Sequence, residues 1–200
     1  MGPYERVGVD RALAIALDLA LQDVPPRASV LDLGCSVGTI SSLLGSIGYQ
    51  VVGVDNDIVA AVQSWHDVQE LRAVRRSSGS CRFVEADIRD FLRSSPETHD
   101  VGLLLSVLHH WLGGYGYTGR GAFARDDVRT TLRLLRTRIR RHLYVEVPTS
   151  DESVEAPPDP EGEFLFPAWF LREGFGVRIE LIASTIATNG KARRLYRVDL

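Results

Sequence analysis

The pattern of apolar and polar residues alternates between short apolar runs and segments with helical spacing. Apolar runs typical of buried parallel strands lie at 29–33, 50–54, 81–85, 100–106 and 142–147. Apolar residues at helical spacing predict helices at 11–21, 38–47, 58–76, 90–94 and 125–139. Because strands and helices alternate, we expect a parallel sheet that is covered by helices on both faces.

The last quarter of the chain changes this pattern. Residues 148–162 are acidic and rich in proline, which indicates a loop, and 164–173 predict a helix that ends at Gly174. Two strands, 177–183 and 194–198, are separated by Asn189-Gly190, a pair typical of hairpin turns. This hairpin would place one antiparallel strand in the sheet.

These elements predict one α/β domain over 1–200. The expected architecture is a three-layer, doubly wound, Rossmann-like fold with a mostly parallel seven-stranded sheet and a closing antiparallel hairpin. Residues 1–24 form its N-terminal helical segment, and 148–163 form a loop and candidate lid.

Composition excludes several classes of protein. The net charge of −3 over 200 residues provides no basic field that would recruit nucleic acid. Cys35 and Cys81 form no CxxC pair, so neither a zinc knuckle nor a disulfide framework is indicated. The N-terminus has no signal pattern, and the apolar stretch at 101–108 is too short to span a bilayer. We therefore expect a cytoplasmic protein with no metal site and no membrane segment.

The residues VLDLGCSVG at 30–38 occupy the first strand-to-helix turn. Ligands of doubly wound sheets bind at the carboxyl ends of the strands, and glycines let the backbone approach them closely. Polar residues follow the next three strands as well: Asp55, then Asp87, then the segment SVLHHW at 106–111. A carboxylate at the position of Asp55 can accept both hydroxyls of a ribose.

Together these motifs resemble the class I S-adenosylmethionine (SAM)-dependent methyltransferases, chiefly over 30–147. The resemblance implies an enzyme that uses SAM as its methyl donor and releases S-adenosylhomocysteine (SAH). It further implies that the glycine turn passes under the methionine part of SAM, that the acid after the second strand holds the ribose, and that the acid after the third strand reaches the adenine. Mapped onto this chain, the implied cofactor residues are Asp32, Gly34, Cys35, Ser36, Gly38, Asp55, Asn56, Asp87, Ile88 and Ser106. The family prefers glycine where Ser36 stands.

Two alternative interpretations concern these same positions. Asp55 and Asp87 could simply cap helices. A nicotinamide-binding Rossmann domain would instead need glycines at 34, 36 and 39, and two of these positions are Ser36 and Thr39. The second alternative is therefore disfavoured.

Three residues are candidates for catalysis. His109 and His110 follow the fourth strand, where this family places its acceptor, and a histidine can serve as a base near neutral pH. Adjacent residues of an extended segment point in opposite directions, so we expect at most one to face the acceptor. Glu146, near the end of the fifth strand, is the third candidate. Its alternative role is that of a solvent-facing or capping carboxylate, and the alternative for the histidines is a structural one.

The leading hypothesis is methyl transfer to a small organic acceptor, in specialised metabolism, with the loops 113–121 and 149–162 on the acceptor side. Methylation of a sugar or nucleic-acid phosphate is an alternative, because the arginines 129, 133, 136, 138, 140 and 141 could meet phosphate. A solvated helix face is the favoured explanation of these arginines, because runs of charge are usually solvated. A non-catalytic SAM-binding partner subunit is the other alternative. The sequence identifies neither the acceptor nor the oligomeric state.

Overall fold

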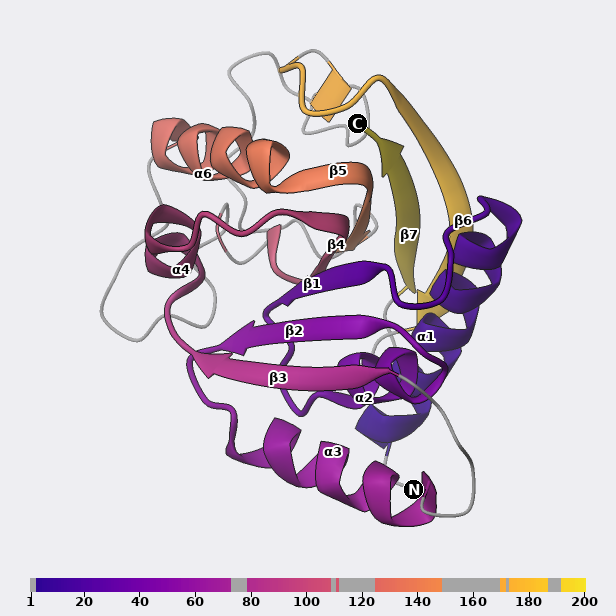
Figure 1. Cartoon of the computed structure of the whole chain (residues 1–200). Helices are drawn as coiled ribbons and strands as arrows, with labels where there is room; N and C mark the ends of the chain where they lie inside the picture. Colours follow the sequence, from indigo (N-terminus) through magenta and orange to yellow (C-terminus); the bar gives the residue numbers. More distant parts are fainter. Residues whose placement is uncertain are drawn as a thin grey trace.

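The computed structural model describes residues 3–72, 79–108, 111, 125–148, 170–171, 173–186 and 192–200 (Figure 1). The helices are α1 (Pro3–Leu21), α2 (Thr39–Ser46), α3 (Val59–Arg72), α4 (Ile88–Ser94) and α6 (Arg125–Arg138). The strands are β1 (Ser29–Leu33), β2 (Gln50–Asp55), β3 (Ser80–Glu85), β4 (His99–Leu105), β5 (Ile139–Pro148), β6 (Arg178–Ile186) and β7 (Ala192–Asp199).

The strands form a seven-stranded sheet in the order β3-β2-β1-β4-β5-β7-β6. Strands β1 to β5 pair in parallel, whereas β7 pairs antiparallel with both β5 and β6. The strand order reverses between β1 and β4, which is the point where doubly wound sheets bind their ligands. The predicted fold class, including the closing hairpin, is confirmed. The assignment of all of 1–200 to one domain stays a prediction.

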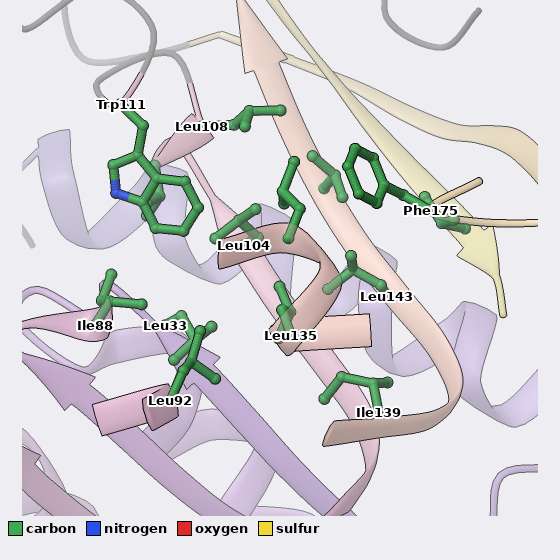
Figure 2. Packing of buried hydrophobic residues seen from close by; sticks show 14 of the residues in the cluster. Leu33, Ile88, Leu92, Leu104, Leu108, Trp111, Leu135, Ile139, Leu143 and Phe175 are labelled. Carbon is green, nitrogen blue, oxygen red and sulfur yellow. The ribbon is translucent and has the colours of Figure 1, made fainter. Parts of the chain in front are cut away.

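Each face of the sheet is covered by its own apolar core. Alternate residues of a strand point to opposite faces, so Val30 packs in one core while Leu31 and Leu33 pack in the other. The first core lies under α1 and α2, and the second lies under α4 and α6, where Leu92 and Leu135 belong to the same cluster as Leu104 (Figure 2). Burial on both faces explains why the sequences of the central strands β1 and β4 are mostly apolar.

A buried polar network fastens α1 to the sheet. The hydroxyl of Tyr144 on β5 donates a hydrogen bond to Asp18 Oδ2 at 2.7 Å. Arg197 Nη1 on β7 donates to Asp18 Oδ1 at 2.8 Å. Burial raises the pKa of Tyr144, so its hydroxyl stays protonated as a donor. In the first half of the same helix, Arg11 lies 2.7 Å from Glu146, near the carboxyl end of β5.

Two elements begin at least three residues earlier than the sequence pattern predicts. Helix α1 begins at Pro3 rather than at residue 11, since proline is tolerated in a first helical turn and the polar residues there gave no apolar period. Strand β5 begins at Ile139 and includes Arg140 and Arg141, whose charge concealed them. The predicted loops 113–121 and 149–162 lie outside the described residues, as does most of the predicted helix 164–173.

Candidate functional site

The turn between β1 and α2 has an unusual backbone. Gly34, Ser36 and Gly38 all have positive φ, at 78°, 50° and 72°. A Cβ atom on Gly34 would lie 2.5 Å from Val107 Cγ2, and one on Gly38 would lie 2.8 Å from Ala61. Both conformation and space therefore require glycine at 34 and 38. Ser36 is exposed and also adopts the left-handed conformation, although it has a Cβ atom and so lacks the conformational freedom of glycine.

Asp55 at the end of β2 holds this turn in place. Its Oδ2 accepts the backbone N–H of Ser36 at 2.8 Å, and its Oδ1 accepts that of Asp57 at 3.3 Å. The residue that accepts the N–H at the start of α3 is Asp57, which bonds Val59 at 3.0 Å. The contacts of Asp55 are therefore not those of a cap of α3. A carboxylate has about four acceptor positions, so Asp55 retains acceptor capacity on both oxygens. Asn56 beside it is exposed.

Asp87 caps helix α4, as the alternative interpretation proposed. Its Oδ1 accepts the backbone N–H groups of Arg89 at 2.9 Å and Asp90 at 3.3 Å, and also Arg89 Nε at 3.3 Å. Burial acts to raise the pKa of Asp87, but these hydrogen bonds outweigh it and the pKa is lowered. The next residue, Ile88, is buried and lies close to the glycine turn, with its Cδ1 3.8 Å from a Cβ on Gly34.

Two candidate residues of the turn are buried. Asp32 Oδ2 accepts the hydroxyl of Ser41 on α2 at 2.6 Å, and burial raises the pKa of Asp32 to about 6. Burial, together with the neighbouring Asp32, raises the pKa of the Cys35 thiol, so this thiol is neutral. Asp32 therefore ties β1 to α2, and Cys35 behaves as a small apolar residue.

Glu146 is the centre of a second polar cluster, at the end of β5. Its side chain is fully buried, and Arg11 Nε lies 2.7 Å from its Oε1. Thr185 Oγ1 donates to the same oxygen at 2.9 Å, and Ser106 Oγ donates to Oε2. Arg193 Nη1 lies 3.7 Å from Oε2 and donates a hydrogen bond to Ser106 Oγ. Glu146 is thus neither solvent-facing nor a helix cap, which corrects that alternative.

The two polar clusters lie at the same edge of the sheet. The glycine turn follows β1, and Ser106 follows β4, its hydrogen-bonded neighbour. Ser106 has a positive φ of 58°, so both turns contain a serine in the left-handed region. Strained backbone of this kind is common at functional sites. The catalytic candidates His109 and His110 lie outside the described residues.

The sequence analysis missed Arg11 and Arg193, the two arginines beside Glu146, which we call the arginine cluster. The arginines that it did select lie elsewhere. Arg129 forms an ion pair with Glu173 at 2.8 Å, and Arg140 forms one with Asp100 at 3.0 Å, where β4 and β5 begin. The charge of Arg140 is therefore paired at the amino edge of the sheet, away from the carboxyl ends of the strands. Arg11 and Arg193 gave no signal, because a single arginine in an amphipathic helix or a short strand is ordinary.

In the described part of the chain, no group of three His, Cys, Asp or Glu side chains could hold a metal ion. No helix among these residues is long and apolar enough to cross a membrane.

Comparison with known proteins decides the family. Residues 31–135, which contain the glycine turn, Asp55, Asp87 and Ser106, match the sequence profile of a methyltransferase domain. The chain belongs to the methyltransferase domain family. With the observed sheet, this confirms a class I SAM-dependent methyltransferase, an enzyme whose methyl donor is SAM. A search by sequence among curated proteins finds no match.

Solved structures of methyltransferases share the fold. WbdD, a bifunctional kinase-methyltransferase, is 23% identical with a TM-score of 0.64; the match covers 99% of this chain and 40% of WbdD. Magnesium protoporphyrin IX methyltransferase (ChlM) from Synechocystis PCC 6803 with bound SAH is 18% identical with a TM-score of 0.67, covering 97% of this chain and 84% of ChlM. The N-methyltransferase NodS from Bradyrhizobium japonicum WM9 is 16% identical with a TM-score of 0.62, covering 99% and 97%. The chain thus spans about 40% of the length of WbdD.

Proposed function

We propose that this methyltransferase transfers the methyl group of SAM to a small organic acceptor that binds beside Ser106, past the end of β4. The observation that carries the proposal is the meeting of two strained turns at one edge of the sheet: the glycine turn held by Asp55, and the turn that begins at Ser106. A small acceptor suits this chain because its net charge of −3 provides no field for a nucleic acid. A role in specialised metabolism remains part of this proposal.

The residues of the first turn fit SAM. Asp55 has acceptor capacity left for the two ribose hydroxyls, and the backbone at Gly34, Ser36 and Gly38 has no bulky side chain that would keep the methionine part away. Ile88 offers an apolar surface for the adenine, with Asp87 beside it. Asn56, Ser106, Asp32 and Cys35 complete the proposed set, the last two as buried supports. When bound, SAM supplies an electrophilic methyl group on a sulfonium, so the chain's main task is to position the acceptor.

The polar cluster around Glu146, which includes Ser106, lies on the proposed acceptor side of the site. Ser106 is fixed by hydrogen bonds with Glu146 and Arg193, so its backbone and hydroxyl present one defined surface. Glu146 is fully buried and contacted by Arg11, Thr185 and Ser106, so we assign it a positioning role rather than that of a base. If the acceptor must lose a proton, His109 or His110 is the candidate base.

Titration of the protein with SAH tests the donor side. Asp55→Ala removes a charged acceptor of hydrogen bonds, which is worth about 1.5–3 kcal/mol, so SAH affinity should fall by about tenfold or more. Asp57→Ala removes a carboxylate two residues away that bonds only the start of α3, and it should leave SAH affinity nearly unchanged. Equal loss in both variants, or loss in neither, would contradict the assignment of Asp55.

Acceptor turnover tests the proposed class of methyl acceptor. Small alcohols, amines and carboxylic acids are incubated with SAM that carries a labelled methyl group, and label transfer is compared with that to oligonucleotides and sugar phosphates. Transfer only to the nucleic acid would overturn the proposed acceptor class. Absence of transfer to any acceptor, with SAH binding intact, would favour a non-catalytic subunit instead.

A further inference from the structure

The outer face of α1 carries a row of exposed leucines. Leu13, Leu17 and Leu21 are 63%, 65% and 70% exposed, although leucine is among the residues that are most often buried. They follow one another at intervals of four residues, so their side chains form a single ridge along the helix. We call this ridge the leucine stripe. Figure 1 shows α1 at the periphery of the sheet, beside α2 and β6.

The leucine stripe is not what attaches α1 to the rest of the domain. The opposite face of the helix supplies Ala12, Ile15 and Leu19 to the buried core, and Asp18 to the polar network with Tyr144. A helix on the surface of a globular protein needs one apolar face, and its other face is ordinarily polar. Helix α1 is apolar on both faces. Its second apolar face therefore indicates an interaction with another molecule.

Exposed carboxylates stand at both ends of the leucine stripe. Asp10 lies one turn before the stripe, and Asp23 lies two residues after it; both residues are exposed. Neither carboxylate forms an ion pair within the part of the chain that the structure describes. Arg141, which lies at the end of α1, donates instead to the backbone oxygens of Gln22 and Asp23, at 3.1 and 3.4 Å. The surface is therefore apolar in the middle and negative at its two ends.

The size and charge of this surface favour a single helix as its partner. A helix of 19 residues is about 28 Å long and about 10 Å across, so α1 offers an area of about 280 Å². A standard interface between two globular chains buries about 800 Å² of each. Charge also disfavours a second copy of this chain, because two stripes that pack antiparallel bring Asp10 of one copy toward Asp23 of the other. A single helix needs only a ridge that fits its grooves.

We propose that the leucine stripe docks an amphipathic helix of a partner protein, with lysine or arginine residues at both ends of that helix. The apolar face of the partner helix covers Leu13, Leu17 and Leu21. Asp10 and Asp23 are 13 residues apart in the sequence, which corresponds to about 20 Å along a helix, so the basic residues of the partner are spaced by about that distance. Spaced apolar anchors supply the affinity, and the flanking charges fix the orientation.

Fluorescence anisotropy of a labelled synthetic peptide, titrated with the full chain, tests the proposal. The probe is a helix of about 18 residues, with leucines at helical spacing and lysines in its first and last turns. It should bind saturably. Leu17→Ser should weaken binding by about tenfold or more, because the central leucine of the stripe is no longer available for burial. A second probe with glutamates in place of the lysines should bind about tenfold more weakly than the first.

The acidic ends of the stripe are tested by a double variant. Asp10→Asn combined with Asp23→Asn should weaken binding of the lysine probe by about threefold or more, and should reduce the sensitivity of binding to salt. Asp67→Asn removes an exposed carboxylate of α3 and should leave binding unchanged. Val177→Ser removes an apolar side chain that is 77% exposed before β6, and it should leave binding unchanged as well.

The fold of the stripe variant is checked separately. The side chain of Leu17 belongs to neither apolar core, so Leu17→Ser should keep SAH affinity and the free energy of unfolding nearly unchanged. Loss of probe binding in a variant that still binds SAH is therefore loss of the docking surface and not of the fold.

Several outcomes would overturn the proposal. The lysine probe does not bind, or it binds equally well to Leu17→Ser. The two control substitutions weaken binding as much as the stripe variants do, which makes the effect one of general charge or hydrophobicity. Sedimentation velocity finds a dimer of the wild type that Leu17→Ser abolishes, in which case a second copy covers the stripe. The wild type binds phosphatidylserine vesicles through Leu17, in which case the stripe contacts a lipid surface.

Discussion

The backbone amide of Ser36 donates a hydrogen bond to the carboxylate of Asp55 at 2.8 Å, and so joins the turn after β1 to the end of β2. The same carboxylate is the group that we assign to the ribose. Its orientation is therefore fixed before any ligand arrives, and such preorganisation reduces the entropy lost on binding. The geometry of Ser36 then bears directly on the geometry of the donor site.

Replacing Ser36 by glycine should stabilise the protein slightly. Ser36 has a φ of 50°, and the left-handed region costs an ordinary residue about 1–2 kcal/mol, against about 0.5–1 kcal/mol for the greater flexibility of glycine. We expect Ser36→Gly to raise the free energy of unfolding by up to about 1 kcal/mol in urea denaturation. The amide that bonds Asp55 is retained, so SAH affinity should not fall.

The neighbouring residue provides the control for this substitution. Val37 has no positive φ, so Val37→Gly gains nothing from the conformational freedom of glycine and should destabilise the protein by about 0.5–1 kcal/mol. Equal effects of the two substitutions would show that strain at Ser36 is negligible.

The histidines after β4 should affect turnover and not donor binding. We expect His109→Ala and His110→Ala to keep SAH affinity within about twofold, and one of them to slow single-turnover methylation by about tenfold or more, since general bases contribute at least that much. Rapid-quench kinetics with an identified acceptor measures this. His66→Ala, on the exposed surface of α3, is the matched control. Unchanged rates in both variants would make the two histidines structural.

Much of the fold could be predicted because its central strands, such as β1 and β4, are buried on both faces. The run 101–105 has no polar side chain, whichever core each residue enters, and Gly34 and Gly38 stand where a Cβ would collide. These signals are local, so a single sequence contains them. Asp55 and Asp87 could be selected because they lie at or just after the ends of the predicted second and third strands.

The arginine cluster could not be predicted because it depends on pairings between distant parts of the chain. Arg193 reaches Ser106 only through the antiparallel pairing of β7 with β5, in which Pro148 lies opposite Arg193. Arg11 reaches Glu146 only because Asp18, two helical turns later on the same face, is held by Tyr144 and Arg197. No local pattern of charge or hydropathy encodes either register.

Breaking the bonds of Asp18 should therefore weaken both stability and the site. Asp18→Ala removes the partner of two buried donors and should lower the free energy of unfolding by about 3 kcal/mol. This value is at the low end for a broken buried pair, because Arg197 retains Asp199 and Glu180 as partners. Tyr144→Phe should cost about 1–2 kcal/mol, and the two substitutions should not be additive. Urea denaturation of both single variants and the double variant measures this.

The surface pair of Asp90 and Arg93 is the reference for these values. Its side chains are 75% and 60% exposed, so Asp90→Ala should cost less than about 1 kcal/mol. A cost for Asp18→Ala that is no greater than this would mean that α1 is held by its apolar contacts alone.

The pH dependence of stability should reveal the buried carboxyl group of Asp32. Burial raises its pKa from 3.8 to about 6 in the folded protein, whereas the unfolded chain keeps the ordinary value. Between these two values the folded protein holds a proton that the unfolded chain has lost. Stability from this group is therefore fully present below pH 3.8 and is lost as the pH rises to about 6, by about 3 kcal/mol in total.

Asp32→Asn isolates this contribution, because the amide resembles the protonated acid and cannot ionise. Its Oδ1 can still accept the hydroxyl of Ser41, so the tie between β1 and α2 is retained. We expect the free energy of unfolding of the variant, relative to that of the wild type, to increase by about 3 kcal/mol as the pH rises from about 4 to about 7. Urea denaturation at each pH measures this. Ser41→Ala removes the hydrogen bond that lowers this pKa, so it should move the transition to higher pH. A difference between Asp32→Asn and the wild type that is constant with pH would show that Asp32 is ionised in the folded protein across the whole range.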